Sequence, residues 1–154
     1  MSCRYAGQES CRKVDIKMSL VGYAMRMAKQ YYKPKTYEHA LRVAGYVAEN
    51  PMIPNDKMDD CIALAIMHDL IEDTEYTGGC FSSGYCHFEE CLNLLTKPKD
   101  MDYLKYIKKI RDYSDTKPEV YWVKMADMKD HLSETVTLTD ELKEKYLKAL
   151  PYLL

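Results

Sequence analysis

The sequence contains little glycine and proline, with six of each among 154 residues. All-β proteins use these residues in their frequent turns, so their scarcity argues against an all-β fold. No apolar run reaches the roughly 18 residues that a membrane-spanning helix requires, and residues 1–5 lack the apolar core of a signal peptide. We therefore expect a soluble, cytoplasmic protein with no membrane partner.

The sequence also lacks a strong imbalance of charge, since its formal net charge is −2. It has neither the basic stripe nor the aromatic and basic platform of nucleic-acid-binding proteins, so we expect no nucleic-acid partner. Apolar residues make up 47% of the chain, which is typical of a globular protein. The length suits a single domain over residues 1–154, and a homo-oligomer is compatible with the sequence.

Cysteine is present, but without the pattern of a secreted, disulfide-stabilised domain. We expect the thiols to be free, because the predicted core is large enough to fold without disulfides. Cys80, Cys86, His87 and Cys91 fall close together. Structural zinc sites usually have cysteine pairs separated by two to four residues, so the wider Cys80–Cys86 spacing favours ordinary thiols over a zinc site.

Apolar residues recur every three or four positions along most of the chain, which predicts helices. We find no convincing strand and no internal repeat. Thr36 and either Asn55 or Asp56 are the expected N-caps of two helices, and residues 78–84 have the composition of a flexible loop. The predicted helices cover approximately residues 14–31, 36–50, 55–69, 87–96, 101–113, a segment from Pro118, and 139–150. The predicted fold class is therefore all-α, a compact bundle of about six or seven helices.

One stretch places ionisable residues directly after an apolar helix. Residues 61–67 are apolar, His68 and Asp69 follow at once, and Glu72 and Asp73 come four positions later. If the helix continues, His68 shares a face with Glu72, and Asp69 with Asp73. Ionisable side chains rarely follow a buried helix so closely unless they are paired or bind a metal.

Two more residues on other predicted helices can complete a metal site with this doublet. His39 and Asp127, together with His68 and Asp69, supply two imidazoles and two carboxylates from three helices. Helical bundles build metal sites in this way, and these ligands suit Mn, Fe, Zn, Co or Ni as a divalent ion. Four protein ligands leave positions for water, which a metal ion activates as a nucleophile.

The same ordered set resembles the HD superfamily of metal-dependent phosphohydrolases. Residues 68–74 are similar to the HDxxEDT signature of the alarmone hydrolases, the hydrolase domains of the stringent-response enzymes and their small stand-alone relatives. These remove the 3′-pyrophosphate from guanosine tetra- and pentaphosphate, (p)ppGpp, typically with Mn²⁺. Residues 95–97 and 123–127 resemble the family's Thr-Lys and Lys-Leu-Ala-Asp motifs. The resemblance covers roughly residues 23–150, with no room for a synthetase domain.

The resemblance implies a role for each matching residue. His39, His68, Asp69 and Asp127 would hold the metal, and Glu72 and Asp73 would position and activate the attacking water. Lys97 and Lys124 are candidates for phosphate contacts. Tyr46 and Tyr146 are candidates for the nucleotide pocket, although tyrosines are also common in cores and on surfaces.

Two departures from the family pattern fall on substrate recognition. His131 stands where the family has an asparagine that helps to hold the nucleotide, one turn after Asp127. It has three open roles: substrate contact, metal ligand, or packing and support. Lys33 and Lys35 only partly match the basic residues that the family places before the first histidine.

We therefore predict a metal-dependent phosphohydrolase acting on (p)ppGpp. Two alternatives stay open. One is an HD-domain nucleotidase or phosphatase for another nucleotide, and the other is a non-catalytic metal- or nucleotide-binding module. Glu72 and Asp73 favour catalysis, because a purely structural metal site does not need them.

Overall fold

The computed structural model describes residues 13–14, 19–78, 80–134 and 137–154. Within them helices predominate, which confirms the predicted all-α class. Helix α4 is a single turn, and the seven other α-helices have ten or more residues. The elements are α1 (Leu20–Tyr31), α2 (Pro34–Ala48), α3 (Asn55–Met67), α4 (Leu70–Asp73), the 3-10 helix η1 (Ser83–Tyr85), α5 (Cys86–Leu95), α6 (Tyr103–Asp112), α7 (Pro118–Ser133) and α8 (Asp140–Leu153). None of the described helices is both long and apolar enough to cross a membrane.

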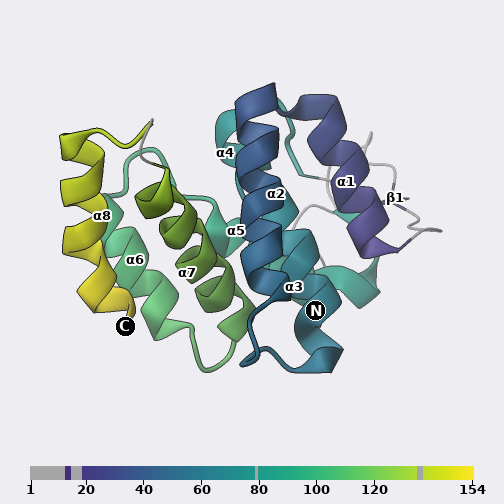
Figure 1. Ribbon diagram of the computed structural model, residues 1–154. Helices are drawn as coiled ribbons and strands as arrows, with labels where there is room; N and C mark the ends of the chain where they lie inside the picture. The colour runs from purple at the N-terminus through teal and green to yellow at the C-terminus, as the bar shows by residue number, and fades with distance from the viewer. Residues whose placement is uncertain (1–12, 15–18, 79, 135–136) are drawn as a thin grey trace.

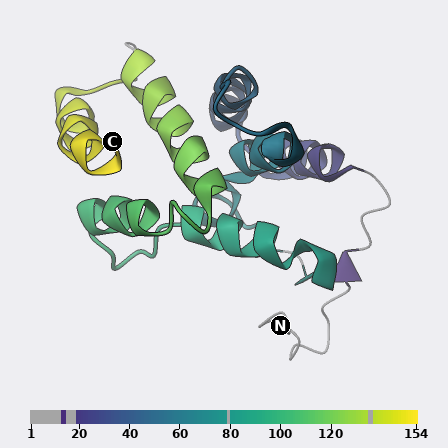
Figure 2. The same ribbon diagram turned by 90° about the horizontal axis from the view of Figure 1, so that it is seen from below.

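Helix α7 stands at the centre of the bundle (Figures 1 and 2). It packs against α2 and α3 on one side and against α6 and α8 on the other, while α1 packs on α3. Helix α3 is the inner helix that its apolar sequence predicts, because residues 63–67 are all at most 2% exposed. The predicted ligands therefore lie on helices that are neighbours in space.

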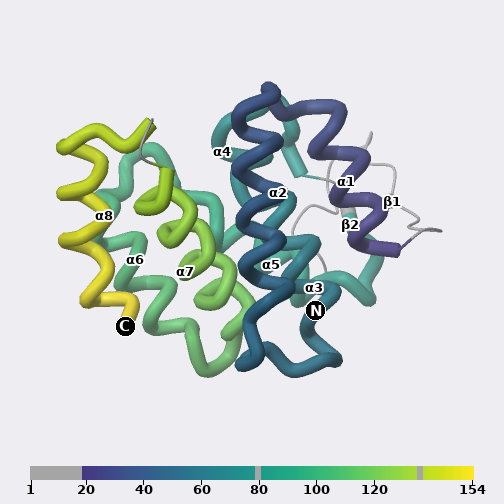
Figure 3. The backbone as a smooth tube through the Cα atoms, viewed as in Figure 1, coloured from purple at the N-terminus to yellow at the C-terminus, as the bar shows by residue number. Residues whose placement is uncertain are grey.

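A short parallel strand pair departs from the prediction of an all-helical chain. Strand β1 (Lys13–Val14) pairs with β2 (Cys80–Phe81), beside α1 (Figure 3). The prediction that the first helix begins near Val14 is therefore wrong. Helix α1 begins at Leu20, where the Ser19 side chain accepts a hydrogen bond from the Gly22 amide at 3.0 Å. β2 and η1 also give defined structure to part of the predicted flexible loop.

Helix starts show which sequence signals were informative. Pro34 was expected to separate two helices, with Thr36 as the cap, but α2 begins at Pro34 itself. Proline suits the first helical position because its missing N–H would have no partner there, and Pro118 begins α7 as predicted. Helix α8 begins within the predicted range, and Thr139 is its N-cap, accepting from the amide of Leu142 at 3.2 Å.

The N-cap of the third helix precedes the two residues predicted for this position. Pro54 occupies the N-cap position of α3, so Asn55 and Asp56 lie in the first turn instead. An acidic side chain in this turn still interacts favourably with the positive end of the helix dipole.

The predicted continuous helix through the His68–Asp69 doublet is also wrong. Helix α3 ends just before His68, Asp69 has φ −101° and ψ 0°, and α4 begins at the next residue. The Tyr32 hydroxyl spans the break, donating to the Ile66 carbonyl at 2.7 Å and accepting from the Asp69 amide at 3.2 Å. Consecutive side chains on a regular helix point in different directions, so this break lets both members of the doublet reach one site.

Candidate metal centre

Four predicted ligands from separate parts of the chain converge between α2, α3 and α7. The Nε2 atoms of His39 and His68 lie 2.9 and 3.2 Å from Oδ1 of Asp127. Oδ2 of Asp69 lies 3.1 Å from His68 Nε2 and 3.7 Å from His39 Nε2. The structure therefore brings together all four residues that the sequence predicts as metal ligands.

The other ring nitrogen of each histidine is engaged away from this centre. His39 Nδ1 lies 2.6 Å from Oδ2 of Asp130, and His68 Nδ1 lies 2.6 Å from the Ala65 carbonyl oxygen. Arg42 donates to both oxygens of Asp130, at 2.8 and 3.1 Å. An Nδ1–H that donates to oxygen leaves Nε2 as the lone-pair donor, which is how proteins orient metal-binding histidines.

Charge complementarity holds the cluster together. Burial by itself would lower the pKa of His68, but Asp69 and Asp127 hold it well above its usual value. Burial would raise the pKa of Asp127, yet Lys124 and the histidines keep it well below the ordinary range. Lys124 is itself buried and donates to Asp127 Oδ2 at 2.7 Å. The carboxylate is thus fixed in its ionised form beside two imidazoles.

The donor set fits a divalent metal ion. His39, His68 and Asp69 form one group whose ligand atoms all lie within 4.8 Å of one another, and His39, Asp127 and His131 form a second. The two groups share His39. Nitrogen and carboxylate ligands of this kind suit several first-row divalent metals and do not select among them.

His131 touches both the ligand cluster and the neighbouring aromatic wall. Its Nε2 lies 3.1 Å from Oδ1 of Asp127, and its ring stacks on Tyr146 with a centroid distance of 4.9 Å and an interplanar angle of 9°. The ring centroid also lies 4.5 Å from that of His39. This position is compatible with each of the three roles that the sequence left open.

Glu72 and Asp73 lie on α4, directly after the doublet, and both are exposed. Partial removal from water raises the pKa of each, and the negative charge of Asp69 raises it further. A carboxylate with a raised pKa is a better proton acceptor than one in open water. Both side chains are therefore within electrostatic range of Asp69 in the cluster.

The predicted phosphate contacts differ in their surroundings. Lys97 donates to the carbonyl oxygens of Pro98 and Met101, both at 3.0 Å, whereas Lys124 is bonded to Asp127. Burial and nearby carboxylates raise the pKa of Glu72, and the positive charges of both lysines oppose this rise. Both lysines therefore lie within electrostatic range of Glu72.

The sequence analysis missed several residues of this region. Lys145 lies 4.2 Å above the Tyr103 ring, and burial followed by the charges of Lys124 and Lys97 lowers its pKa. Its place beside Tyr146 in the sequence gave no signal, because consecutive side chains on a helix point in different directions. Asp130 was also missed, although its spacing from Asp127 puts the two on one face of α7.

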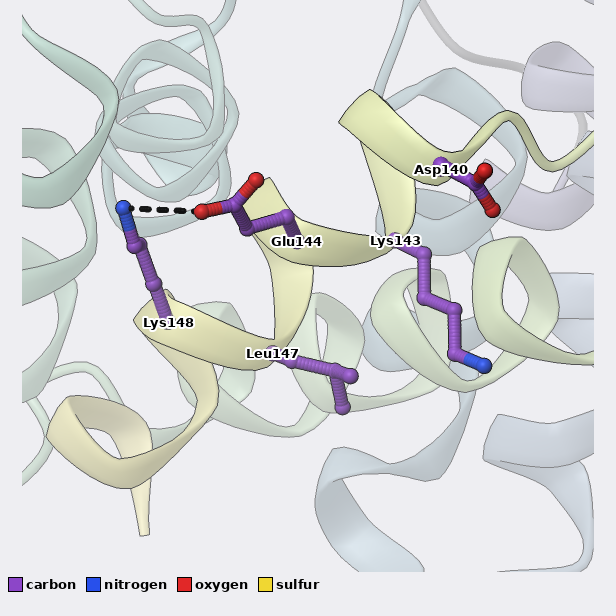
Figure 4. Close-up of a pocket in the computed structure, with 5 residues that line it drawn as sticks. All are labelled: Asp140, Lys143, Glu144, Leu147 and Lys148. Atoms are coloured by element: carbon purple, nitrogen blue, oxygen red, sulfur yellow. Dashed lines mark ion pairs between the residues drawn. The ribbon is translucent and has the colours of Figure 1, made fainter.

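Two other hollows lie outside the ligand cluster. The outward face of α8 has a shallow one lined by residues such as Leu147, where Lys148 pairs with Glu144 at 3.2 Å (Figure 4). Tyr46 lies in a separate groove with Trp122, 4.5 Å from the Lys129 ammonium group. The groove is not lined by any of the four predicted metal ligands, which weakens Tyr46 as a nucleotide contact.

Comparison with known proteins shows a similarity of structure. No family model matches the sequence, and no curated protein matches it. The structure is similar to that of a metazoan ortholog of SpoT that hydrolyzes ppGpp and plays a role in starvation responses, with a TM-score of 0.57 and 16% sequence identity. The match covers 87% of this chain and 83% of the other. This chain therefore shares its fold with that protein, which agrees with the fold implied by the resemblance.

Proposed function

We propose that this protein is a cytoplasmic, metal-dependent phosphohydrolase that removes the 3′-pyrophosphate of guanosine tetra- or pentaphosphate. The observation that carries this proposal is the cluster of His39, His68, Asp69 and Asp127 with two further carboxylates one turn away. The shared fold with a structure described as hydrolyzing ppGpp supports the choice of substrate. Mn²⁺ is the proposed ion, since the alarmone hydrolases typically use it.

The four clustered residues would hold the ion through His39 Nε2, His68 Nε2 and the carboxylates of Asp69 and Asp127. When bound, such an ion activates a water molecule and offsets phosphate charge. Asp130 and the Ala65 carbonyl oxygen orient the two imidazoles. Lys124 fixes Asp127, so we assign it a positioning role in place of the direct phosphate contact expected from the sequence.

Glu72 and Asp73 would act on the attacking water. A carboxylate oxygen of one accepts a proton as the water oxygen bonds to phosphorus. The bond from that phosphorus to the ribose 3′-oxygen breaks, and this oxygen takes up a proton as pyrophosphate departs. Both side chains are exposed on α4, so they can reach a substrate bound over the cluster.

The substrate would lie between α4, α6 and α8. Lys97 and Lys145 supply positive charge for the pyrophosphate, since each lies within electrostatic range of Glu72. The hydroxyl of Tyr103 is buried and has no hydrogen bond of normal geometry among the described residues, although the Lys124 ammonium group is close enough to oppose the rise in its pKa that burial causes. A buried hydroxyl of this kind is costly unless a water molecule or a ligand completes it. Tyr146 and His131 form the stacked wall beside this region.

The direct test is to incubate the purified chain and Mn²⁺ with guanosine tetraphosphate and to measure pyrophosphate release. Glu72→Gln and Asp73→Asn are the informative variants, because they should lose turnover and retain bound metal. Nucleotide binding without turnover under Mn²⁺, Fe²⁺, Co²⁺ and Zn²⁺ would instead support a non-catalytic binding module.

A second candidate is an HD-domain phosphohydrolase for another nucleotide. The observation that favours it is His131, which replaces the family's asparagine and contacts Asp127. A panel of nucleotides assayed beside guanosine tetraphosphate separates the two functions. His131→Asn should improve turnover of guanosine tetraphosphate if this residue is what redirects specificity.

A further inference from the structure

A second set of metal-binding side chains lies apart from the candidate active site, where α5 meets the start of α7. His87 and Cys91 are one turn apart on α5, and Glu119 lies in the first turn of α7. Figure 2 shows this end of α7 over α5. The sequence analysis considered His87 and Cys91 together with Cys80 and Cys86, and the Cys80–Cys86 spacing favoured ordinary thiols. Glu119 was not among its candidates.

The three donor atoms face one another. His87 Nε2 lies 2.6 Å and Cys91 Sγ 3.3 Å from Oε2 of Glu119, and the nitrogen and sulfur are 3.7 Å apart. Tetrahedral zinc bound by nitrogen, oxygen and sulfur separates its ligand atoms by about 3.3–3.6 Å. The 3.3 Å distance lies in this range and the 3.7 Å distance exceeds it by about 0.1 Å, whereas the 2.6 Å distance needs to open by about 0.7 Å.

Burial and charge favour an ion at this position. The Glu119 side chain is only 1% exposed, and Lys57 pairs with its other oxygen, Oε1, at 2.8 Å. This contact leaves Oε2 directed at the histidine and the thiol. A divalent ion with one thiolate and one carboxylate is neutral, which is much less costly to bury than a separate charge. The Lys57 ammonium group keeps its positive charge, but this side chain is 39% exposed, so water solvates it. The His87 side chain is 49% exposed, so solvent can reach the fourth coordination position.

We propose that His87 Nε2, Cys91 Sγ and Glu119 Oε2 bind one zinc ion, with water as the fourth ligand. Binding forms a zinc–sulfur bond and releases the thiol proton to solvent, while the contacts of Glu119 Oε2 with His87 and Cys91 give way to bonds with zinc. A thiolate with an imidazole selects zinc over Mn²⁺. The proposed catalytic site contains no sulfur, so the protein would hold two ions of different preference.

The zinc ion would brace the helix that carries the candidate active site. Glu119 and Asp127 are eight residues apart on α7, which corresponds to about 12 Å along the helix axis. Tying the start of α7 to α5 fixes its position with a bond stronger than a surface contact. We assign the ion a bracing role from this placement, and its loss should loosen α7 without removing any proposed ligand of the catalytic ion.

The test uses the full chain, stripped with a chelator and titrated with Co²⁺ as a spectroscopic substitute for zinc. Thiolate-to-cobalt charge transfer absorbs in the near ultraviolet, and only a site with a cysteine ligand produces it. We expect one equivalent of this absorption in the wild type and its loss in Cys91→Ser and His87→Ala. Because the His87 side chain is half exposed, His87→Ala should fold normally, and it tests the site even if the Cys91 variant fails to fold.

Cys86→Ser is the matched control, because it removes a neighbouring thiol on the same helix and should keep the absorption. Asp127→Ala should also keep it, which separates this site from the proposed catalytic one whether or not the chain hydrolyses guanosine tetraphosphate. No thiolate absorption in the wild type would show that Lys57, Glu119 and His87 form a hydrogen-bonded ion cluster only. Absorption that survives Cys91→Ser would also overturn the assignment.

Discussion

The two ends of the candidate active site are built differently. At the metal end, Asp127 contacts three histidines and Lys124, and its side chain is only 4% exposed. At the substrate end, Lys145 and Glu72 are exposed and are tied to their surroundings mainly by longer-range charge.

This contrast indicates which end is preorganised. The metal end is fixed by short, buried hydrogen bonds before any ligand arrives, so removing one member leaves other charges buried without a partner. The substrate end gains most of its order from what binds there. We therefore expect mutations at the metal end to have large effects and those at the substrate end to have small ones.

The largest expected effect follows from Asp127→Ala. Its loss removes the carboxylate shared by the histidines, so the catalytic metal should dissociate and kcat should fall at least about a thousandfold. Metal content and pyrophosphate release measure the two outcomes. Asp127→Ala also leaves Lys124 buried without its partner, which could unfold the chain. Asp69→Ala is therefore a second variant, because the Asp69 side chain is 17% exposed. Normal turnover in either variant would refute the proposed ligand set.

Glu72→Gln and Asp73→Asn lie between the two ends and should have the next largest effect. Loss of the proton acceptor should lower kcat about a hundredfold or more, while metal content remains that of the wild type. Single-turnover rates and metal analysis of each variant distinguish catalysis from metal binding. A variant that also loses its metal would move that residue from the water to the ligand set.

Asp130→Asn tests the support behind the metal end. Asp130 orients His39, so its replacement should weaken metal affinity about 10- to 100-fold, as loss of a second-shell partner does in other metal sites. A competition titration with Mn²⁺ measures this. Glu134→Gln is the control, because Glu134 pairs with Arg42 at 3.3 Å on the surface and does not contact the histidine. Equal affinities in the two variants would show that Asp130 is only a structural ion-pair partner.

The smallest effect is expected at the substrate end, from Lys145→Ala. Losing one charged contact to the pyrophosphate should raise KM about tenfold with little change in kcat. Lys148→Ala is the matched control on the same helix, since Lys148 faces outward and pairs with Glu144 (Figure 4). A similar rise in KM for both would mean that α8 contributes only a general positive field.

The same contrast explains what could be predicted from the sequence. His68 and Asp69 were recognisable because ionisable residues directly follow an apolar helix, and His39 and Asp127 followed from an ordered set that resembles a known superfamily. Neither spacing nor periodicity could reveal the break between α3 and α4. The hydroxyl that bridges this break belongs to Tyr32, the C-cap residue of α1, which is distant in the sequence. Helical periodicity is local, whereas that contact is not.

The sequence by itself determined the helical class and the paired carboxylates, since these depend on residue type and short-range spacing. The four candidate ligands followed from residue type and from the ordered set that resembles a known superfamily. Only the tertiary structure decided which distant side chains join them. Packing of separate helices brings together three pairs of side chains: Asp130 with His39, Lys145 with Tyr103, and Glu119 with Cys91. Their distance along the chain carries no periodic signal, so the supporting contacts of both proposed metal sites appear only once α7 is in place against its neighbours.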